Sequence, residues 1–255
     1  MKIRMEIIFF VIGAIIASFA GVVSERLHTG QGFLTGRSSC NACNAPLSTF
    51  ALIPIVSYFI SHGRSLCCEA RISARAPVTE ILLGALFVLS YLNLGITVAL
   101  PFFLISLSAL LALVLYDLAH QILPPSLLAV FIAASAAARF FISASISDLF
   151  SSLAAALLIA LFLALIHFAS SGRAMGLADA PLAFGLSLLA GPNAFSGFIF
   201  SFWIGAVIGI TLLLRRPRGS RMGVEVPFAP YLAAGFLLAY FTQWNIFALV
   251  RGSLL

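Results

Sequence analysis

The sequence predicts an all-α, polytopic transmembrane protein with about eight helical spans and a small cysteine-containing loop domain on the cytoplasmic side. Two observations predict this class. Hydrophobic residues make up 62% of the chain and charged residues only 9%, whereas soluble domains carry roughly 25% charged residues. Apolar runs of about 17 to 22 residues, long enough to cross a hydrocarbon core roughly 30 Å thick, recur from end to end.

The eight predicted spans have approximate limits 5–23, 80–98, 100–117, 126–143, 149–169, 179–192, 195–214 and 227–247. The sixth has the weakest pattern, because Pro181, Gly185 and Gly191 interrupt a short run. The first could be mistaken for a signal peptide, since Lys2 and Arg4 precede it. We expect it to be retained as a span, on the motif pattern described below.

The only long polar segment between spans, residues 24–79, fixes the predicted orientation. If this segment is cytoplasmic, alternation places ten of the fourteen Lys and Arg residues on the cytoplasmic side and four, including Arg139, outside. This is the usual bias of membrane proteins, and it explains the basic net charge without nucleic acid. We predict three regions: a first span in 1–23, a cytoplasmic cysteine loop in 24–79 and a membrane domain in 80–255.

Two of the eight acidic residues, Asp117 and Asp179, are not explained by loops or outer span ends. Asp117 ends an apolar run and Asp179 opens one, so alternation brings both to the cytoplasmic face. Ionisable residues at membrane depth are costly and indicate function. Two carboxylates that meet near water suit an aspartic protease, in which one takes a proton from water and the other donates one to the carbonyl. The alternative is that each merely marks a helix end.

Helix dipoles predict different roles for the two aspartates. An anion is disfavoured at a helix C-terminus, where Asp117 lies, and favoured at an N-terminus, so Asp179 is the expected base. His120 and His167, near helix ends, are interpreted as polar boundary residues.

The four cysteines form a second constellation, CNAC at 40–43 followed by the adjacent Cys67 and Cys68. Disulfides are rare in the cytoplasm, so a structural zinc site is expected, with free thiols as the alternative. Adjacent side chains in an extended chain point apart. His62 and Glu69 therefore remain open as sources of the fourth ligand.

Seven short motifs follow one another along nearly the whole chain: ASFAGVVSERL at 17–27, CNAC at 40–43, LIPIVSY at 52–58, ISARAPVTE at 72–80, YDLAHQILP at 116–124, MGLAD at 175–179 and VPFAPYLAAG at 226–235. Each is weak by itself. In this order and spacing they resemble the type IV prepilin peptidase family, membrane aspartic proteases that also methylate the N-terminus they create.

The resemblance implies a reaction and its residues. Asp117 and Asp179 match the catalytic aspartates, and Gly176 matches the first glycine of the catalytic turn. The protein would be a multi-pass enzyme of the bacterial cytoplasmic (inner) membrane. It would remove the short leader of type IV prepilin or pseudopilin precursors, with the lipid bilayer as its surroundings and no nucleic acid partner.

The resemblance also implies a zinc-containing loop linked to N-methylation, with S-adenosylmethionine as methyl donor. Cys40 and Cys43 match the first cysteine pair and Cys68 matches the last cysteine of the second. The remaining family cysteine aligns with Ser65, while Cys67 is out of register.

Four further positions depart from the family pattern: Gly21 replaces an asparagine, Pro125 an aspartate, Ala178 the second glycine of the catalytic turn and Pro181 a lysine. Only glycine accepts a positive φ cheaply. We therefore expect Ala178 to keep a right-handed or extended backbone.

Two other classes of protein compete with the protease. A proton-coupled transporter also uses intramembrane aspartates, but it predicts acids near the midplane and repeated broken spans. A non-catalytic paralogue acting in pilus or secretion assembly would explain the altered positions around intact aspartates.

Overall fold

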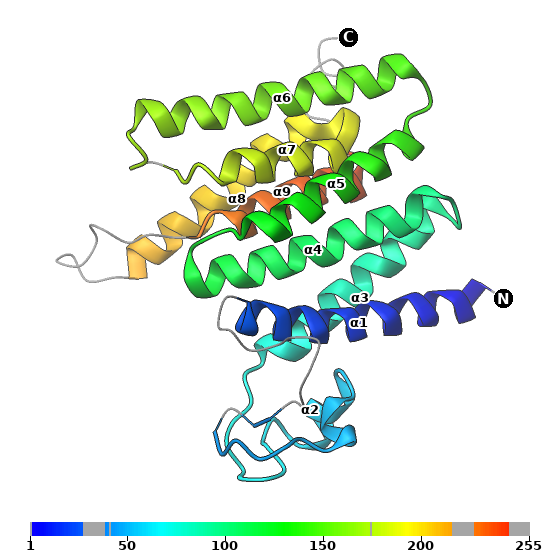
Figure 1. Ribbon diagram of the computed structural model, residues 1–255, viewed down its shortest axis with the longest axis vertical. Coiled ribbons are helices and arrows are strands. Elements are labelled where there is room, and N and C mark those ends of the chain that lie inside the picture. Colours follow the sequence, from blue (N-terminus) through cyan, green and yellow to red (C-terminus); the bar gives the residue numbers. More distant parts are fainter. Residues whose placement is uncertain (1, 28–38, 41, 174, 216–226, 245–255) are drawn as a thin grey trace. The chain divides into compact units, whose positions relative to one another are not determined.

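The computed structural model describes residues 2–27, 39–40, 42–173, 175–215 and 227–244 (Figure 1). Apart from two isolated β-bridges, the secondary structure of these residues is helical, which confirms the all-α class. The helices are α1 Lys2–Arg26, α2 Val56–Ile60, α3 Arg75–Leu94, α4 Ala99–His120, α5 Pro125–Ile142, α6 Ile146–Ala169, α7 Asp179–Ala190, α8 Ala194–Arg215 and α9 Ala229–Thr242, with the 3-10 turns η1 Thr49–Leu52 and η2 Gly191–Asn193. The chain divides into two compact units, Met1–Ile96 and Thr97–Leu255.

Eight of these helices correspond in order to the eight predicted apolar runs, but they differ in length. Within the described residues, six segments are long and apolar enough to cross a membrane, and one of them, Asp179–Leu212, joins α7 and α8. α7 has 12 residues and α9 has 14. At 1.5 Å per residue they rise about 18 and 21 Å, less than a hydrocarbon core of roughly 30 Å. The predicted number of eight spans is therefore the number of apolar helices, and not all of these helices are full-length spans.

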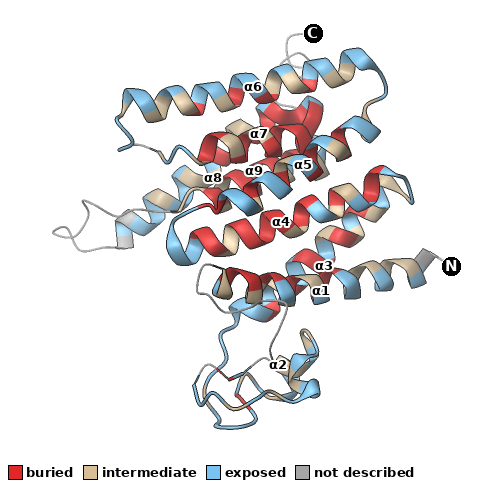
Figure 2. Cartoon of the chain, viewed as in Figure 1, coloured by how far each residue is buried: buried red, intermediate tan, exposed pale blue. Residues whose placement is uncertain are grey.

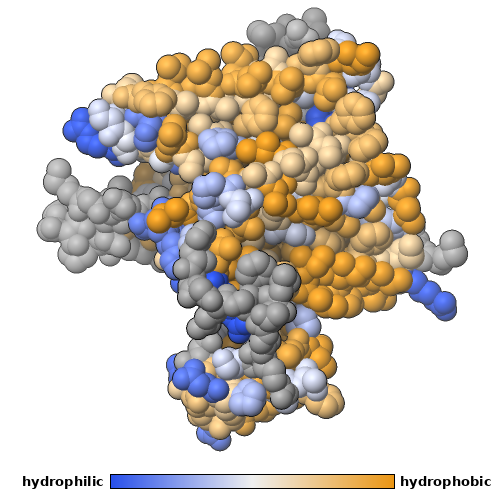
Figure 3. Space-filling view, viewed as in Figure 1, coloured by the Kyte–Doolittle hydropathy of each residue, from blue (hydrophilic) through white to orange (hydrophobic). Residues whose placement is uncertain are grey.

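Apolar side chains face outward as well as inward, as a lipid-facing surface requires. On α6, Leu157, Leu158, Leu161 and Leu165 are each 55–58% exposed, and Figure 3 shows apolar side chains along this helix. Exposure of so much apolar surface to water would be unfavourable, whereas contact with lipid tails is not.

In the first unit, α1 and α3 cross where both helices have a glycine. A Cβ on Gly13 would lie 2.8 Å from the Gly84 Cα, and one on Gly84 would lie 2.9 Å from the Phe10 ring. Between helices in a bilayer the hydrophobic effect gives no driving force for association. Close packing through small residues, which let the backbones approach, holds such helices together instead. This contact places α3 beside the first span, within the first unit. The predicted domain division after residue 79 stays a prediction.

In the second unit, α7 is the most enclosed helix. It packs on α5, α6, α8 and α9, and Figure 2 shows it buried along its length. Its Gly185 lies against the Phe131 ring of α5, where a Cβ would come within 2.5 Å of the ring. The short α7 therefore lies at the centre of the second unit, and Asp179 is its first residue.

Arg139, predicted only as an outside cation, is a buried anchor of the second unit. It is 4% exposed and its guanidinium donates to Asp148 Oδ1 at 2.5 Å, from α5 to the first turn of α6. Gly191, with φ +57, leaves space on the other side, because a Cβ there would collide with Arg139 Nη1. Helices α5 and α6 and the end of α7 therefore meet at Arg139.

Candidate active site

Asp117 lies in the last turn of α4 and is 6% exposed. The helix ends three residues later at His120, and Gln121, with φ +56, returns its N–H to the Asp117 carbonyl at 2.8 Å. The backbone N–H of Ala229, the first residue of α9, acts on the Asp117 carboxylate. Asp117 Oδ2 is buried and has no hydrogen-bond partner among the described residues. A buried carboxylate oxygen without a partner is costly, and such groups mark sites of function.

Asp179 begins α7 and is 8% exposed. The backbone N–H of Gly176 acts on its carboxylate from close by. Asp179 lies close enough to Asp117 for the charges of the two carboxylates to interact. The second unit therefore brings together, near helix ends, the two aspartates that the sequence singled out.

The arrangement weakens the dipole argument for unequal roles. Asp117 lies at the C-terminal end of α4 but also receives an N–H from the N-terminus of α9. The favourable end of one helix dipole offsets the unfavourable end of the other. The dipoles no longer single out Asp179 as the base.

The turn before α7 has an ordinary backbone conformation, and its contribution to the site is a backbone N–H. A Cβ on Gly176 would lie 3.4 Å from Asp179 Oδ2, an ordinary van der Waals contact. Ala178 has φ −69 and ψ −16, the right-handed conformation expected for a residue that replaces glycine. The chain can therefore build this turn with alanine at position 178.

The four cysteines of the first unit come together on two similar turns. In the first, Cys40 donates its N–H to the Ala45 carbonyl at 2.9 Å and accepts one from Asn44 at 2.8 Å. Asn44 has φ +57, and an isolated bridge joins Ser39 to Pro46.

The second turn repeats this pattern around Ser65. Ser65 donates its N–H to the Ala70 carbonyl at 2.8 Å and accepts one from Glu69 at 2.8 Å. Glu69 has φ +55, and a bridge joins Arg64 to Arg71. By this correspondence, Ser65 occupies the place of Cys40.

The sulfur atoms of Cys40, Cys43, Cys67 and Cys68 all lie within 4.8 Å of one another, so these residues could hold a metal ion. The expectation that the adjacent Cys67 and Cys68 point apart was wrong, because the chain turns sharply there instead of extending. Neither open candidate for the fourth ligand joins the cluster within the described residues. Glu69 instead lies 4.0 Å from Arg64 at the surface.

Hydrogen bonds within the cluster separate the acidities of the thiols. Ser65, the largest influence, lies 3.3 Å from Cys40 Sγ and helps to lower the pKa of that thiol to about 5. The neighbouring Cys67, 3.1 Å from Cys43 Sγ, raises the pKa of Cys43 to about 12. Cys40 is therefore the more acidic of these two thiols, and the thiolate is the form that binds metals.

Two family descriptions match the chain: Bacterial Peptidase A24 N-terminal domain over residues 11–94 and Type IV leader peptidase family over residues 102–214. A Bacillus subtilis (strain 168) protein named Prepilin leader peptidase/N-methyltransferase is 30% identical over 236 residues, covering 91% of this chain and 92% of that protein. The chain belongs to the type IV leader peptidase family. This confirms the resemblance drawn from the seven motifs.

Further relatives extend the similarity. Proteins of the same name from Legionella pneumophila and Pseudomonas aeruginosa are 29% and 30% identical, over 80% and 85% of this chain and 72% and 76% of their own length. No solved structure matches the chain.

The remaining departures from the family pattern fit the local structure. Pro125 and Pro181 lie in the first turns of α5 and α7. In a first turn the backbone N–H that proline lacks would have no partner within the helix. Gly21 has nothing within 4 Å of where a Cβ would be, so its small size is not imposed by a neighbour. Each of these three residues is therefore compatible with the helix in which it lies.

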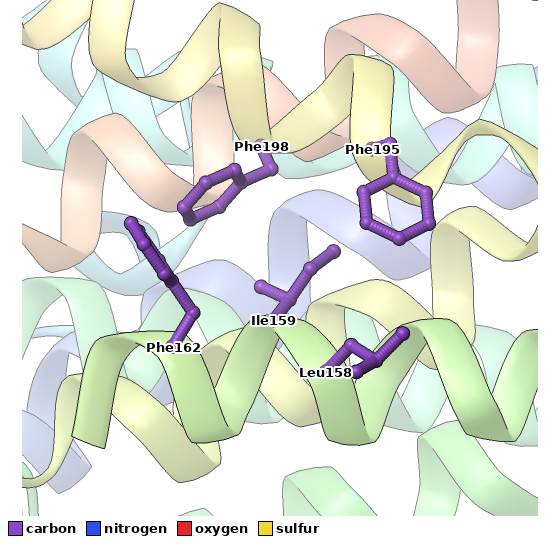
Figure 4. A pocket seen from close by; sticks show the side chains of 5 residues that line it. All are labelled: Leu158, Ile159, Phe162, Phe195 and Phe198. Carbon is purple, nitrogen blue, oxygen red and sulfur yellow. The ribbon is translucent and has the colours of Figure 1, made fainter. Parts of the chain in front are cut away.

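A hollow between α6 and α8 is not part of this chemistry. Its volume is about 250 Å³, and it is lined by Leu158, Ile159, Phe162, Phe195 and Phe198 (Figure 4). Hydrocarbon side chains of this kind can neither move a proton nor bind a metal. The hollow therefore provides no second catalytic candidate.

Sequence reasoning missed Glu80. This residue is 6% exposed on α3, and its Oε2 accepts the Ile55 N–H at 2.6 Å. Ile55 has φ +63 and ψ −56, and the Val56 N–H reaches the Pro54 carbonyl at 2.5 Å across it, which makes a strained γ-turn. Glu80 thus holds the cysteine loop to the membrane helix. Only its position in the ISARAPVTE motif hinted at a role.

Proposed function

We propose that this protein is a membrane aspartic endopeptidase that removes the leader of type IV prepilin or pseudopilin precursors. The observation that carries the proposal is the pairing of two buried carboxylates in one unit. Asp117 closes α4 and keeps an oxygen without a partner, and Asp179 opens α7 within reach of its charge. Membership of the type IV leader peptidase family supports the same reaction.

Two carboxylates that share one proton are sufficient for hydrolysis. The ionised aspartate takes a proton from a water molecule while the water oxygen attacks the scissile carbonyl carbon. The protonated aspartate donates its proton to the carbonyl oxygen as the tetrahedral intermediate forms. Collapse of the intermediate breaks the C–N bond, and the amine leaves with a proton from the pair. No covalent bond to the enzyme is required.

The location of the aspartates near helix ends suits a substrate that is itself a membrane helix. We propose that the apolar segment of the precursor enters laterally from the bilayer, with its short basic leader in the cytoplasm. Apolar side chains exposed along α6 support a lipid-facing surface. On this basis the protein is a multi-pass component of the bacterial cytoplasmic (inner) membrane.

N-methylation of the new N-terminus is the second candidate activity. The N-terminal family domain over residues 11–94 contains the four-cysteine cluster, and the relatives' names carry both activities. S-adenosylmethionine is the methyl donor that this activity implies.

The cysteine cluster fits a structural zinc ion. Four zinc–sulfur bonds of about 2.3 Å in a tetrahedron place sulfur atoms about 3.8 Å apart. The sulfurs of Cys40 and Cys68 are 3.7 Å apart, and those of Cys43 and Cys67, at 3.1 Å, would move apart slightly on binding. Cys43 and Cys67 would complete the ligand set. The ion would hold the two turns together and take no part in peptide hydrolysis.

The test is coexpression with candidate precursors from the same genome, followed by intact-mass measurement of the product. Leader removal and the added mass of a methyl group appear in the same spectrum. Asp117→Asn and Asp179→Asn should each reduce cleavage roughly 10⁴-fold or more, because such pairs act as one unit. Substantial turnover by either variant would end the aspartic-protease proposal.

Asp148 provides a matched control, because it is the only other aspartate in the chain. Asp148→Asn breaks the ion pair with Arg139 and costs stability, yet it should still cleave. This comparison separates a loss of chemistry from a loss of fold. A wild-type protein that cleaves no precursor would favour the non-catalytic paralogue instead.

A further inference from the structure

We propose that His167 is a positioning residue for Asp179, acting through the peptide unit between Met175 and Gly176. The proposal rests on the proposed function, since it gives His167 a role in the aspartyl reaction. The sequence offered only a boundary role for this residue.

The contact that carries the proposal is a short hydrogen bond from α6 to the turn before α7. His167 Nδ1 lies 2.8 Å from the Met175 carbonyl oxygen. A carbonyl oxygen can only accept, so the proton of this bond is on Nδ1. The bond fixes both the imidazole tautomer and the direction of the carbonyl.

The same peptide unit reaches the carboxylate on its other side. The carbonyl of Met175 and the N–H of Gly176 belong to one planar peptide, and Gly176 lies against the Asp179 carboxylate, because a Cβ on Gly176 would be 3.4 Å from Asp179 Oδ2. The path therefore runs from His167 Nδ1–H through one peptide, whose N–H acts on Asp179. Hydrogen bonds in series polarise one another, so a donor on the carbonyl makes the N–H a better donor.

The loop is shaped to keep the imidazole in this place. Gly172, with φ +76, donates its N–H to the His167 carbonyl at 2.8 Å. A Cβ on Gly172 would lie 3.3 Å from the His167 Cε1 atom. The chain thus folds closely over the ring before it reaches Met175. Without the His167 bond, the Met175–Gly176 peptide can rotate and turn its N–H away from Asp179.

The test compares two replacements of His167 in the precursor-cleavage assay with the full-length protein. His167→Leu removes the donor, and His167→Asn places an amide N–H close to the position of Nδ1. We expect kcat to fall about tenfold in the leucine variant, with KM unchanged, and to stay within about threefold of wild type in the asparagine variant. Tenfold corresponds to about 1.4 kcal/mol. Leu165→Ala, at an exposed position on the same helix, is the control that retains the bond.

A second measurement does not depend on activity. In ¹⁵N-labelled protein, the histidine signal that is lost in His167→Leu should be that of an Nδ1–H tautomer. The Gly176 amide proton should shift upfield in both His167→Leu and Asp179→Asn but not in Leu165→Ala. An unchanged kcat in a folded leucine variant, equal losses in the leucine and asparagine variants, or an Nε2–H tautomer would overturn the proposal.

These results are distinguishable from failure of the proposed function. If Asp117→Asn still cleaves, the aspartyl reaction is wrong, while the NMR measurement still reports on the hydrogen-bond chain. If the aspartate variants are inactive and His167→Leu is not impaired, only the role of His167 is wrong.

Discussion

We predict that the fourth ligand of the proposed zinc site can be moved from residue 67 to residue 65. Ser65 holds the place in the second turn that Cys40 holds in the first, and its Oγ lies 3.3 Å from Cys40 Sγ and 3.1 Å from Cys67 Sγ. A sulfur atom at residue 65 would therefore already lie inside the cluster. We predict that Cys67→Ala weakens zinc binding and that adding Ser65→Cys restores it.

The size of the effect follows from the ligand count. Structural zinc sites in small peptides have apparent binding free energies of about 10–16 kcal/mol. Shared among four thiolates, this is about 3 kcal/mol each, so loss of one should weaken zinc binding roughly 100-fold or more. The double variant regains four thiolates and should bind within about tenfold of wild type, on the same reckoning.

The assay is competition with a chromophoric zinc chelator on purified full-length protein, with elemental analysis for stoichiometry. A matched control places the new cysteine outside the cluster, as Ser73→Cys in the Cys67→Ala background, and should restore nothing. The ligand set would be refuted if Cys67→Ala binds zinc as tightly as wild type. Wild-type protein that contains no zinc when purified without chelator would refute the site itself.

Three further predictions concern contacts that hold the fold. Asp148→Asn should lower the free energy of unfolding by about 3 kcal/mol, because it leaves the buried Arg139 without its charged partner, and thermal unfolding measures the loss. Glu80→Ala should leave the Ile55 N–H unsatisfied, at a cost of about 2 kcal/mol, so limited proteolysis of the cysteine loop should quicken; an unchanged digestion rate would contradict this anchor. Gly84→Leu should separate α1 from α3, because the crossing has no space for a side chain, and a cysteine cross-link between these helices should then fail to form.

Some of the site could be predicted because its signals are local. Apolar runs fix helices in a bilayer, since every backbone polar group must be satisfied within the segment. Asp117 and Asp179 stand out because an acid beside such a run is costly. The spacing of Cys40 and Cys43 on one turn is a local pattern as well.

The contacts that decide how these groups work join residues that are distant in the chain. The Ala229 N–H reaches Asp117 only because α9 packs beside α4. Glu80 meets Ile55 across 25 residues. No periodicity or motif encodes such a meeting.

The sequence by itself therefore determined the helices, the candidate carboxylates and the four thiols, because hydropathy and motif spacing act over a few residues. Only the tertiary structure showed that Cys67 joins the cysteine cluster, while Ser65 occupies the position in the second turn that Cys40 occupies in the first. It also showed that His167 contacts the turn before Asp179. The direction of a side chain depends on which backbone folds over it, and the turn at Gly172 decides that for His167.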